Sequence, residues 1–546
     1  MDGPEAQSSA QGERKEVKTS RKAALKRTAG TKPKRKKTPR LDYTVQQGED
    51  MLLVISNPMP DYEGSAWAPK KKGGKKKAAA TAKGKNKTEN NMKKKVKPKV
   101  GNKALIKEEE KHLSVEVPLG SVGHRWGQSL PEEVLINIFH MVVAQDGAVP
   151  FLCRVGRVCR LWNAAASTPL LWRSVTVGHC WIAPGKNQLP KTEQKVKDTV
   201  EWLAQSRFSQ LRHFSLCHWK QNVDFVLEVV SRFCPHLHSL KLSYCSGLTA
   251  SAFLSLGLNS RSLQNLNLQN SEFQVDGLLE FLECHGGQIR QILFTHGLKN
   301  DKLMAAITRG FCPDLELLEV NTKLNSKDCE LSICVQALQM VCPKLKTFRM
   351  LNVRPHHKTM RNAADPPPGF PLLEELCIAT ASHSYMTDRD LMDILHGSRR
   401  LRVLDVRGCA RITPSGLAAL PCPELECLFW GQYFSSHSSS LPKRGFNLVT
   451  EKWCQTLREL DIANQMFTED DLEVAMSFLA QAPDVETLRS LNLSGTKITP
   501  SALRSVVGQL TALQYLNLSS CRYLPRGVKR LYRGQGDIRQ LLDKLD

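Results

Sequence analysis

Residues 401–420 read LRVLDVRGCARITPSGLAAL, and this stretch decides the fold because two periodicities follow each other within it. Leu401, Leu404 and Val406 are spaced as the inward-facing residues of a short buried strand. Thr413 and Pro414 then form a good cap and first-turn pair, which predicts a helix directly afterwards. One strand and one helix bury little surface alone, so the stretch is expected to be a single unit of a stacked array.

The pattern L-x-x-L-x-L, with other apolar residues at some positions, recurs along the chain after residue 210. Its starts are about 27 residues apart on average, which is within the range of leucine-rich repeats. The starts are Leu211, Leu237, Leu263, Ile289, Leu315, Leu345, Leu373, Leu401, Leu425, Leu457, Leu488 and Leu513. We therefore expect an α/β fold over 206–546, a leucine-rich-repeat solenoid with parallel strands on its concave side, helices on its convex side and a helical cap at 525–546.

Cysteines recur at fixed places in these repeats. Cys245, Cys409 and Cys521 stand eight residues after their repeat starts, and Cys-Pro pairs precede other starts at a constant offset. The cysteines of those pairs are Cys234, Cys312, Cys342 and Cys422. No C-x-x-C pair occurs in the sequence, which disfavours a metal site, so we expect these thiols to be small buried hydrophobic groups.

Side chains at the second, fourth and sixth positions after each start are expected to face the concave cavity and to be exposed there. Candidate substrate-binding residues are Lys241, Asn267, Glu319, Arg349, Asp405, Arg407, Tyr433, Phe434 and Asp461. The two aromatics belong to the insertion 429–446, where binding hot spots and local packing explain them equally well. A second insertion, 356–370, contains two histidines, but without ligand spacing we expect a solvated loop there.

The start of the chain is rich in lysine. Residues 1–120 contain 30 Lys and Arg against 14 Asp and Glu, so they carry +16 of the chain's formal charge of +24. The clusters are PKRKKTPR (33–40), PKKKGGKKK (69–77) and NMKKKVKPK (91–99). The Ala, Gly, Thr and Pro between them cannot supply a core, so residues 1–124 are predicted to be disordered.

Part of this tail has the composition of an address signal. Nuclear import signals are short basic runs such as Lys34, Arg35, Lys36 and Lys37, and we expect the protein in the nucleus or nucleolus as well as the cytoplasm. The same lysines can hold nucleic-acid phosphates weakly and without sequence preference, or can simply solvate the tail. One apolar island, GEDMLLVISNPMPDYEG (48–64), is either a docking peptide or an apolar run in a loop.

Residues 125–178 have a globular composition and a helical pattern. Ser129 and Glu132 are spaced as a capping box, and Pro131 suits a first helical turn. Apolar residues then recur at steps of three and four on both sides of a QDGAVP break. The expected elements are a helix from about 130, a second helix over 152–162 and a short element around 169–172, followed by a linker over 179–205.

This segment closely resembles the F-box, a small all-α module. The stretches LPEEVLINIF (130–139), RVCRLWN (157–163) and PLLWRSV (169–175) carry the resemblance, in that order. The loop AQDGAVPF (144–151) is longer than the family pattern. With the cysteine-containing repeats behind it, the whole chain resembles the F-box and leucine-rich-repeat family.

The resemblance implies a receptor subunit of a Skp–cullin–F-box ubiquitin ligase, with a Skp-type adaptor, a cullin and a RING subunit as partners and an unknown protein as substrate. It places residues on or behind the adaptor contact: Leu130, Pro131, Leu135, Ile138, Phe139, Val158, Cys159 and Trp162. Any one of them is otherwise a core residue of the module.

Two other classes of function remain open. A nuclear scaffold could hold the adaptor without ubiquitin transfer, which the lysine-rich tail favours. An enzyme is disfavoured, because we find no nucleophile beside a base, no RING zinc spacing and no Gly-rich phosphate loop. We expect no cofactor and no metal. The sequence has no 18-residue apolar run and begins MDGPEAQSSAQGERK without an apolar signal, so a soluble protein of a reducing compartment is expected.

Overall fold

The computed structural model describes most of the chain from Leu130 onward. The described residues are 44–48, 51–56, 130–178, 190–297, 301–322, 330–357, 369–380, 384, 386–432, 443–481 and 487–545. Of the predicted disordered tail it describes the backbone of two strands, β1 (Thr44–Gly48) and β2 (Met51–Ser56), which pair in a sheet of their own. β2 lies within the apolar island. The lysine clusters, including Lys34 to Lys37, lie outside the described residues, and their disorder stays a prediction.

Residues 130–178 form a small helical unit. Its elements are α2 (Glu132–Asp146), α3 (Phe151–Val155), α4 (Arg160–Ala166), the 3-10 helix η1 (Pro169–Trp172) and β3 (Ser174–Val177). The single helix predicted over 152–162 is wrong, because Cys159 has an extended backbone and separates α3 from α4. The apolar spacing continues through this break, so the pattern alone could not reveal it.

The predicted capping box at the start of α2 is also wrong. The helix begins at Glu132, its N-cap is Pro131 in an extended conformation, and no side chain caps it. Glu132 is thus the first helical residue and cannot reach back as the third would. Glu132 and Glu133 still lie in the first turn, where negative charge complements the helix dipole.

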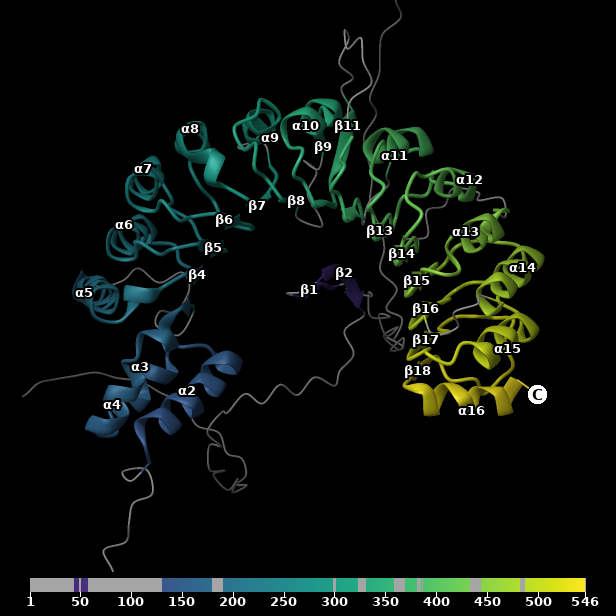
Figure 1. Cartoon of the computed structure of the whole chain (residues 1–546), viewed down its shortest axis with the longest axis horizontal. Helices are drawn as coiled ribbons and strands as arrows, with labels where there is room; N and C mark the ends of the chain where they lie inside the picture. Colours follow the sequence, from purple (N-terminus) through teal and green to yellow (C-terminus); the bar gives the residue numbers. More distant parts are fainter. Residues whose placement is uncertain are drawn as a thin grey trace, which may run out of the picture. The chain divides into compact units, whose positions relative to one another are not determined.

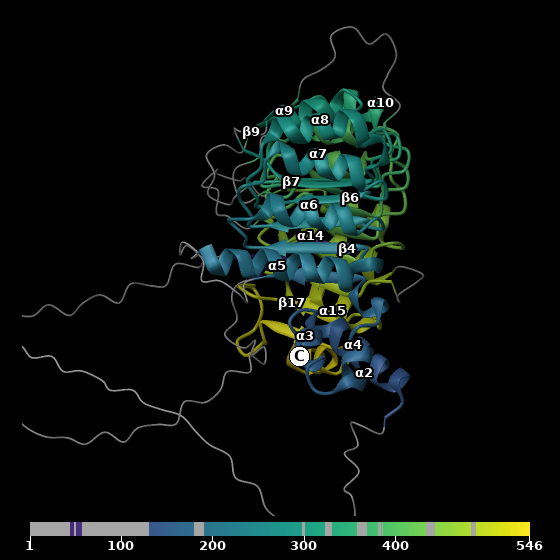
Figure 2. The same cartoon turned by 90° about the vertical axis from the view of Figure 1, so that its left-hand side faces the viewer.

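The predicted linker contains a helix. α5 (Pro190–Ser206) occupies its second half, and Val196, Val200 and Leu203 of this helix are buried. These residues recur at steps of four and three, which places them on one face. The many charged residues on the other faces of α5 hid this pattern in the composition. Figure 2 shows α5, α6, α7 and α8 stacked along the convex side.

In the described part of the chain, fourteen strands form one sheet, in which the strand order follows the chain apart from β9 and β11. Twelve of them are the predicted repeat strands, and each begins two residues after its predicted start. They are β4 (His213–Cys217), β5 (Ser239–Ser243), β6 (Asn265–Leu268), β7 (Gln291–Thr295), β8 (Leu317–Asn321), β10 (Thr347–Leu351), β12 (Glu375–Cys377), β13 (Val403–Asp405), β14 (Cys427–Phe429), β15 (Glu459–Asp461), β16 (Ser490–Asn492) and β17 (Tyr515–Asn517). The expectation of a leucine-rich-repeat solenoid is confirmed.

Helices return the chain from one strand to the next on the outer side of the curved sheet (Figure 1). They are α6 (Val223–Phe233), α7 (Ala250–Asn259), α8 (Val275–His285), α9 (Asp301–Thr308), α10 (Val335–Val341), α11 (Asp388–Leu395), α12 (Pro414–Ala418), α13 (Phe446–Trp453), α14 (Glu469–Ala480) and α15 (Pro500–Gln509). Short 3-10 helices precede β4 and β7, η3 (Phe208–Gln210) and η4 (Gly286–Gln288). The leucines of the repeat pattern are buried between sheet and helices in one continuous core.

The insertion at 356–370 differs from the solvated loop that was expected. Its first residues, His356 and His357, belong to β11 (Arg354–His357), which pairs in parallel with β9 (Glu330–Ile333). Residues 358–368 lie outside the described part of the chain.

A left-handed turn follows many of the strands at the seventh position after the repeat start. Gly408 has a φ of 81° and Gly495 a φ of 71°, and Asn270, Asn352 and Asn464 have φ values of 56° to 58°. Glycine and asparagine tolerate this backbone better than other residues. His218, Tyr244 and Ser520 adopt the same conformation at this position, so glycine is needed only where a Cβ would clash with the neighbouring repeat, as at Gly408.

The last repeat is covered by the C-terminal segment. β18 (Leu531–Arg533) pairs antiparallel with β17, and α16 (Gln535–Leu545) buries Ile538, Leu541 and Leu545. The array thus ends with a strand of reversed direction and a helix, which closes its core. No helix in the described ranges is both long and apolar enough to span a bilayer.

Candidate binding surfaces

The first candidate surface is an apolar stripe on α2. Val134 is 41% exposed and Met141 60% exposed, and the partly buried Ile138 lies between them on the same helix face. Pro131 at the helix start is exposed as well. Large apolar side chains left open along one face of a small module make that face a candidate interaction surface. Val134 and Met141 were missed from the sequence, although their spacing from Ile138 could have indicated them.

Other residues predicted for this contact lie inside the helical unit. Leu135 and Phe139 are 1% and 2% exposed, and the Phe139 ring lies edge-on to those of Phe151 and Trp162, with centroids 5.6 Å and 5.4 Å away. Leu135 and Phe139 therefore pack behind the open stripe and hold α2 against α3 and α4.

The remaining predicted residues differ in exposure. Leu130, Cys159 and Trp162 are partly buried, whereas Val158 is 61% exposed in the turn before α4. Of the predicted set, Pro131 and Val158 are thus exposed to a partner, and the partly buried Leu130, Ile138, Cys159 and Trp162 offer smaller areas.

The helical unit is joined to the repeats by a shared sheet and core. β3 pairs in parallel with β4 from Ser174 opposite His213 to Val177 opposite Leu216. Trp172 donates a hydrogen bond from Nε1 to the Ala166 carbonyl at 2.8 Å, and its ring centroid lies 5.9 Å from that of Phe208. This continuity fixes the direction of the α2 stripe relative to the first repeat.

The second candidate surface is a row of side chains on the concave face of the sheet. The strand register places the fourth positions of the repeats side by side: Lys241, Asn267, Leu293, Glu319, Arg349, Cys377, Asp405, Phe429, Asp461, Asn492 and Asn517. Six predicted binding residues belong to this row, which we call the concave row. The structure therefore brings them into one line, but the line is long, and Lys241 is distant from Asp461 along it.

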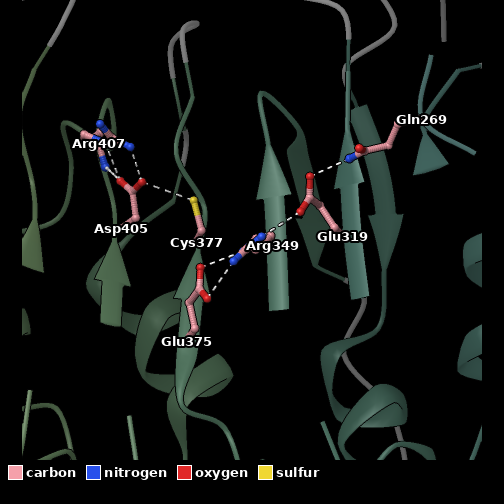
Figure 3. Close-up of polar contacts among 7 residues, drawn as sticks. All are labelled: Gln269, Glu319, Arg349, Glu375, Cys377, Asp405 and Arg407. Carbon is pink, nitrogen blue, oxygen red and sulfur yellow. Dashed lines mark hydrogen bonds and ion pairs between the residues drawn. The ribbon is translucent and has the colours of Figure 1, made fainter. Parts of the chain in front are cut away.

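The centre of the concave row is tied together by charged hydrogen bonds (Figure 3). Arg349 donates to Glu375 through Nε at 2.7 Å and Nη2 at 2.9 Å, and to Glu319 through Nη1 at 3.1 Å. Gln269 donates from Nε2 to Glu319 at 2.5 Å. Burial disfavours a charged guanidinium, but the two carboxylates outweigh it and raise the pKa of Arg349. Arg349 therefore stays charged and crosslinks three repeats.

A second ion pair lies further along the concave row. Arg407 donates to Asp405 through Nε at 2.8 Å and Nη2 at 2.6 Å, and its guanidinium lies 5.4 Å from the centroid of the Phe429 ring. Cys377 donates from Sγ to Asp405 at 3.4 Å. Figure 3 shows this ion pair together with the hydrogen bonds of Arg349. Planar, two-point pairing of this kind fixes the orientation of both partners.

Several predicted binding residues are not exposed as the sequence pattern suggested. Glu319 and Asp405 are 0% exposed, Arg407 5% and Asp461 7%. Lys241 is exposed, and Asn267 and Arg349 are partly exposed. Tyr433 and Phe434 lie outside the described residues. The expectation of exposure is wrong for these four. Glu319 pairs with Arg349 of the next repeat, Asp405 and Arg407 pair with each other within one repeat, and Asp461 accepts from the Ala463 amide.

Two members of the concave network were missed from the sequence. Glu375 stands at the second position and Cys377 at the fourth position after Leu373. Both positions are among those that were expected to face the concave cavity. If every residue at these positions had been taken as a candidate in every repeat, both residues would have been found.

The repeat cysteines behave as buried apolar groups, as expected. Burial raises the pKa of Cys234, Cys312, Cys342 and Cys409 to about 12 in each case. Cys245, Cys409 and Cys521 each place Sγ within 3.1 to 3.5 Å of a carbonyl of the preceding repeat. These thiols link neighbouring units and are poor nucleophiles.

Comparison with known proteins agrees with this architecture. Residues 128–177 match the family model described as F-box-like, and residues 397–420 and 486–507 match the one described as Leucine Rich repeat. The chain thus carries an F-box-like domain followed by leucine-rich repeats. The F-box/LRR-repeat protein 4 of Bos taurus is 24% identical over 267 residues, which cover 45% of this chain and only 37% of that relative's length.

Two solved structures resemble the chain more distantly. A chain of the yeast Rad7 and Elc1 complex gives a TM-score of 0.39 at 15% identity, covering 77% of this chain and 87% of that one. A chain of the TLR13–ssRNA13 complex gives a TM-score of 0.33 at 13% identity, covering 65% of this chain and 58% of that one.

Proposed function

We propose that this protein is the substrate-recognition subunit of a Skp–cullin–F-box ubiquitin ligase. Its F-box-like domain would bind a Skp-type adaptor, which connects it to a cullin and a RING subunit, and its repeats would hold a target protein for ubiquitin-dependent degradation. The observation that carries the proposal is an F-box-like domain with an open apolar stripe, joined to the repeats by a continuous sheet.

The physical logic is tethering. The domain at one end of the sheet holds the ligase while the solenoid holds the target, which raises the effective concentration of target lysines near the ubiquitin-charged enzyme. A rigid connection through β3 and β4 would restrict the positions that a bound target can take relative to the ubiquitin-charged enzyme. In this proposal the protein contributes no catalytic group, and the transfer belongs to other subunits.

Within the F-box and leucine-rich-repeat family, the finer resemblance is to its sixth member. The expanded loop AQDGAVPF, the stretch RGCARITPSGL and the ending CRYLPRGVKRLYRG support it. We also propose residence in the nucleus and cytoplasm, on the basis of the basic run from Lys34 to Lys37.

The adaptor contact is tested by charging the stripe. A Val134→Asp/Met141→Asp double variant places two carboxylates on the open face of α2 without touching the core. Its matched control is Leu254→Asp/Leu258→Asp, since both leucines are more than 60% exposed on α7. Purified adaptor and cullin should be captured by the wild type and the control and lost by the α2 variant.

The alternative function is a nuclear scaffold that holds the adaptor without ubiquitin transfer, which the lysine-rich tail favours. The abundance and ubiquitination of the proteins that crosslink to the repeats in cells distinguish the receptor from the scaffold. If the protein is a receptor, these proteins accumulate when the α2 variant replaces the wild type. Unchanged abundance and unchanged ubiquitination of every bound protein would support the scaffold.

A further inference from the structure

A hollow of about 380 Å³ lies where the last two repeats meet α16. Its lining consists of Arg489, Thr511, Ala512, Gln514, Gln535 and Arg539. Arg489 directly precedes β16, Gln514 directly precedes β17, and the other two long side chains come from α16. Figure 1 shows α16 beside β18 at the end of the solenoid. We call this hollow the C-terminal pocket.

The two arginines of the pocket have no protein anion to bind. Neither guanidinium has a hydrogen bond or an ion pair with any other residue in the part of the chain that the structure describes. Asp537, in the first turn of α16, forms an ion pair with Lys529 at 3.3 Å and is not part of the lining. The pocket therefore contains two unneutralised cations and no carboxylate.

The repeat register explains why this charge is left over. Residues that directly precede the strands form a ladder at the rim of the sheet, in which Arg402 and Arg458 both pair with Glu426. Arg489 is the next rung after Arg458, since its amide donates to the Arg458 carbonyl, and Gln514 follows with a bond to the Arg489 carbonyl. Arg489 follows another arginine on one side and precedes a glutamine on the other, so no acidic side chain stands next to it in the ladder.

The shape and chemistry of the pocket suit one oxyanion group. Guanidinium groups bind phosphate through two parallel hydrogen bonds, and the amide of Gln514 and the hydroxyl of Thr511 add polar groups beside them. The volume is at the lower end for a ligand site, which suits a phosphorylated side chain. No aromatic residue lines the pocket, so bases of a nucleic acid would find no stacking surface.

We infer that the C-terminal pocket binds a phosphorylated serine or threonine in a segment of a protein substrate. The inference rests on the proposed function, since it names the chemical class of target that the repeats would hold. A peptide lying along the concave face would reach the pocket at the rim of its last strands. The lysine-rich tail of this chain does not fit it, because like charges repel.

The test uses the full-length chain and three immobilised peptide libraries with degenerate flanks. Their central residue is phosphoserine, serine or glutamate. The protein variants are the wild type, Arg489→Glu, Arg539→Glu, the double variant, and Arg261→Glu as a control at an exposed arginine outside the pocket. Competition with inorganic phosphate and with a single-stranded RNA oligonucleotide separates an isolated phosphate group and a polyanion from the peptide.

The wild type and the control should bind the phosphoserine library at least about tenfold more tightly than the serine library, since charged hydrogen bonds are at stake. Each pocket variant should remove this preference. Equal binding of the phosphoserine and serine libraries by the wild type, full binding by the double variant, or tighter binding of RNA that displaces the peptide would overturn the inference.

Adaptor capture by the same samples keeps the two proposals separate. The pocket variants are remote from α2, so they should capture the adaptor as the wild type does. If adaptor capture fails for every sample while the phosphoserine preference persists, the ligase assignment fails and the pocket remains. If capture succeeds and the preference is absent, only the pocket is overturned.

Discussion

Arg349 on β10 holds both carboxylate oxygens of Glu375 on β12, through Nε at 2.7 Å and Nη2 at 2.9 Å. The same guanidinium reaches Glu319 on β8 at 3.1 Å. Arg349 is 15% exposed by side chain, and its partners are 0% and 9% exposed. A single cation on β10 thus balances two buried anions, one on each of the neighbouring strands β8 and β12.

Replacing Arg349 should therefore cost much more than replacing an exposed cation. Arg349→Met leaves two buried carboxylates without a counter-charge, for which we expect about 3 to 5 kcal/mol of lost stability. Lys344→Met removes an exposed pair with Asp314 and should cost less than about 1 kcal/mol. The shift in the midpoint of urea unfolding measures the stability loss of each variant. Similar shifts for the two variants would contradict the crosslinking role of Arg349.

The left-handed turn at Gly408 gives a second prediction. A Cβ built on Gly408 would lie 2.1 Å from the Thr380 carbonyl oxygen of the neighbouring repeat, and its φ of 81° disfavours a side chain. The Gly408→Ala substitution should lower the free energy of unfolding by roughly 2 kcal/mol or more, because the backbone would be strained and the carbonyl displaced.

Gly508 provides the matched control for Gly408. It lies in α15, and a Cβ there would meet no atom within 4 Å. The Gly508→Ala substitution should raise the free energy of unfolding by about 0.5 to 1 kcal/mol, because alanine is favoured over glycine in helices. Thermal unfolding of the two variants should shift in opposite directions, and a stabilised Gly408→Ala variant would show that the turn is not constrained by Thr380.

The repeat architecture could be predicted because its signal is local. Leu401, Leu404 and Val406 alternate within six residues, and the same spacing marks each strand two residues after its predicted start. The break at Cys159 could not be predicted in this way, since the helical spacing of apolar residues continues across it. Cys159 is extended, and the break it makes lets Trp162 of α4 lie against Phe139 of α2 with ring centroids 5.4 Å apart.

The concave row was predicted by position but not by environment. Glu319 and Arg349 stand at the same position of their repeats, yet the sequence does not say that residues 30 positions apart will neutralise each other. Their burial depends on the register between β8 and β10, a property of two stacked units. The binding roles of Lys241 and Asn267 stay predictions, as do those of Tyr433 and Phe434.

Thiol reactivity offers a third prediction. Cys284 is exposed, whereas Cys234, Cys312 and Cys342 are buried with pKa values raised to about 12 by that burial. At pH 8 the buried thiols are almost entirely protonated and inaccessible, so iodoacetamide should label Cys284 first. Peptide mass spectrometry of briefly treated native protein measures the order. Labelling of the buried cysteines at the rate of Cys284 would mean that the repeats open readily.

The pH dependence of stability should depend on Lys443. Burial lowers the pKa of this lysine to about 8, although its Nζ donates to the Gln465 side chain at 3.2 Å and lies 5.2 Å from the Trp430 ring centroid. Between pH 8 and the ordinary lysine pKa, the unfolded chain binds a proton at this side chain that the folded chain has released. Because the unfolded state binds more protons, this residue's contribution to stability rises with pH in that window.

A Lys443→Met variant isolates this contribution, because all other titrating groups are shared with the wild type. The free energy of unfolding of the wild type minus that of Lys443→Met should increase as the pH rises from 8 toward 10, and it should be nearly constant below pH 7, where the lysine is charged in both states. Urea unfolding at each pH measures the difference. A difference that stays flat up to pH 10 would mean that Lys443 keeps its proton in the fold, so the hydrogen bonds and the aromatic contact would compensate for burial. A difference that falls with pH would mean that the fold raises the lysine pKa, which is the opposite of what its burial predicts.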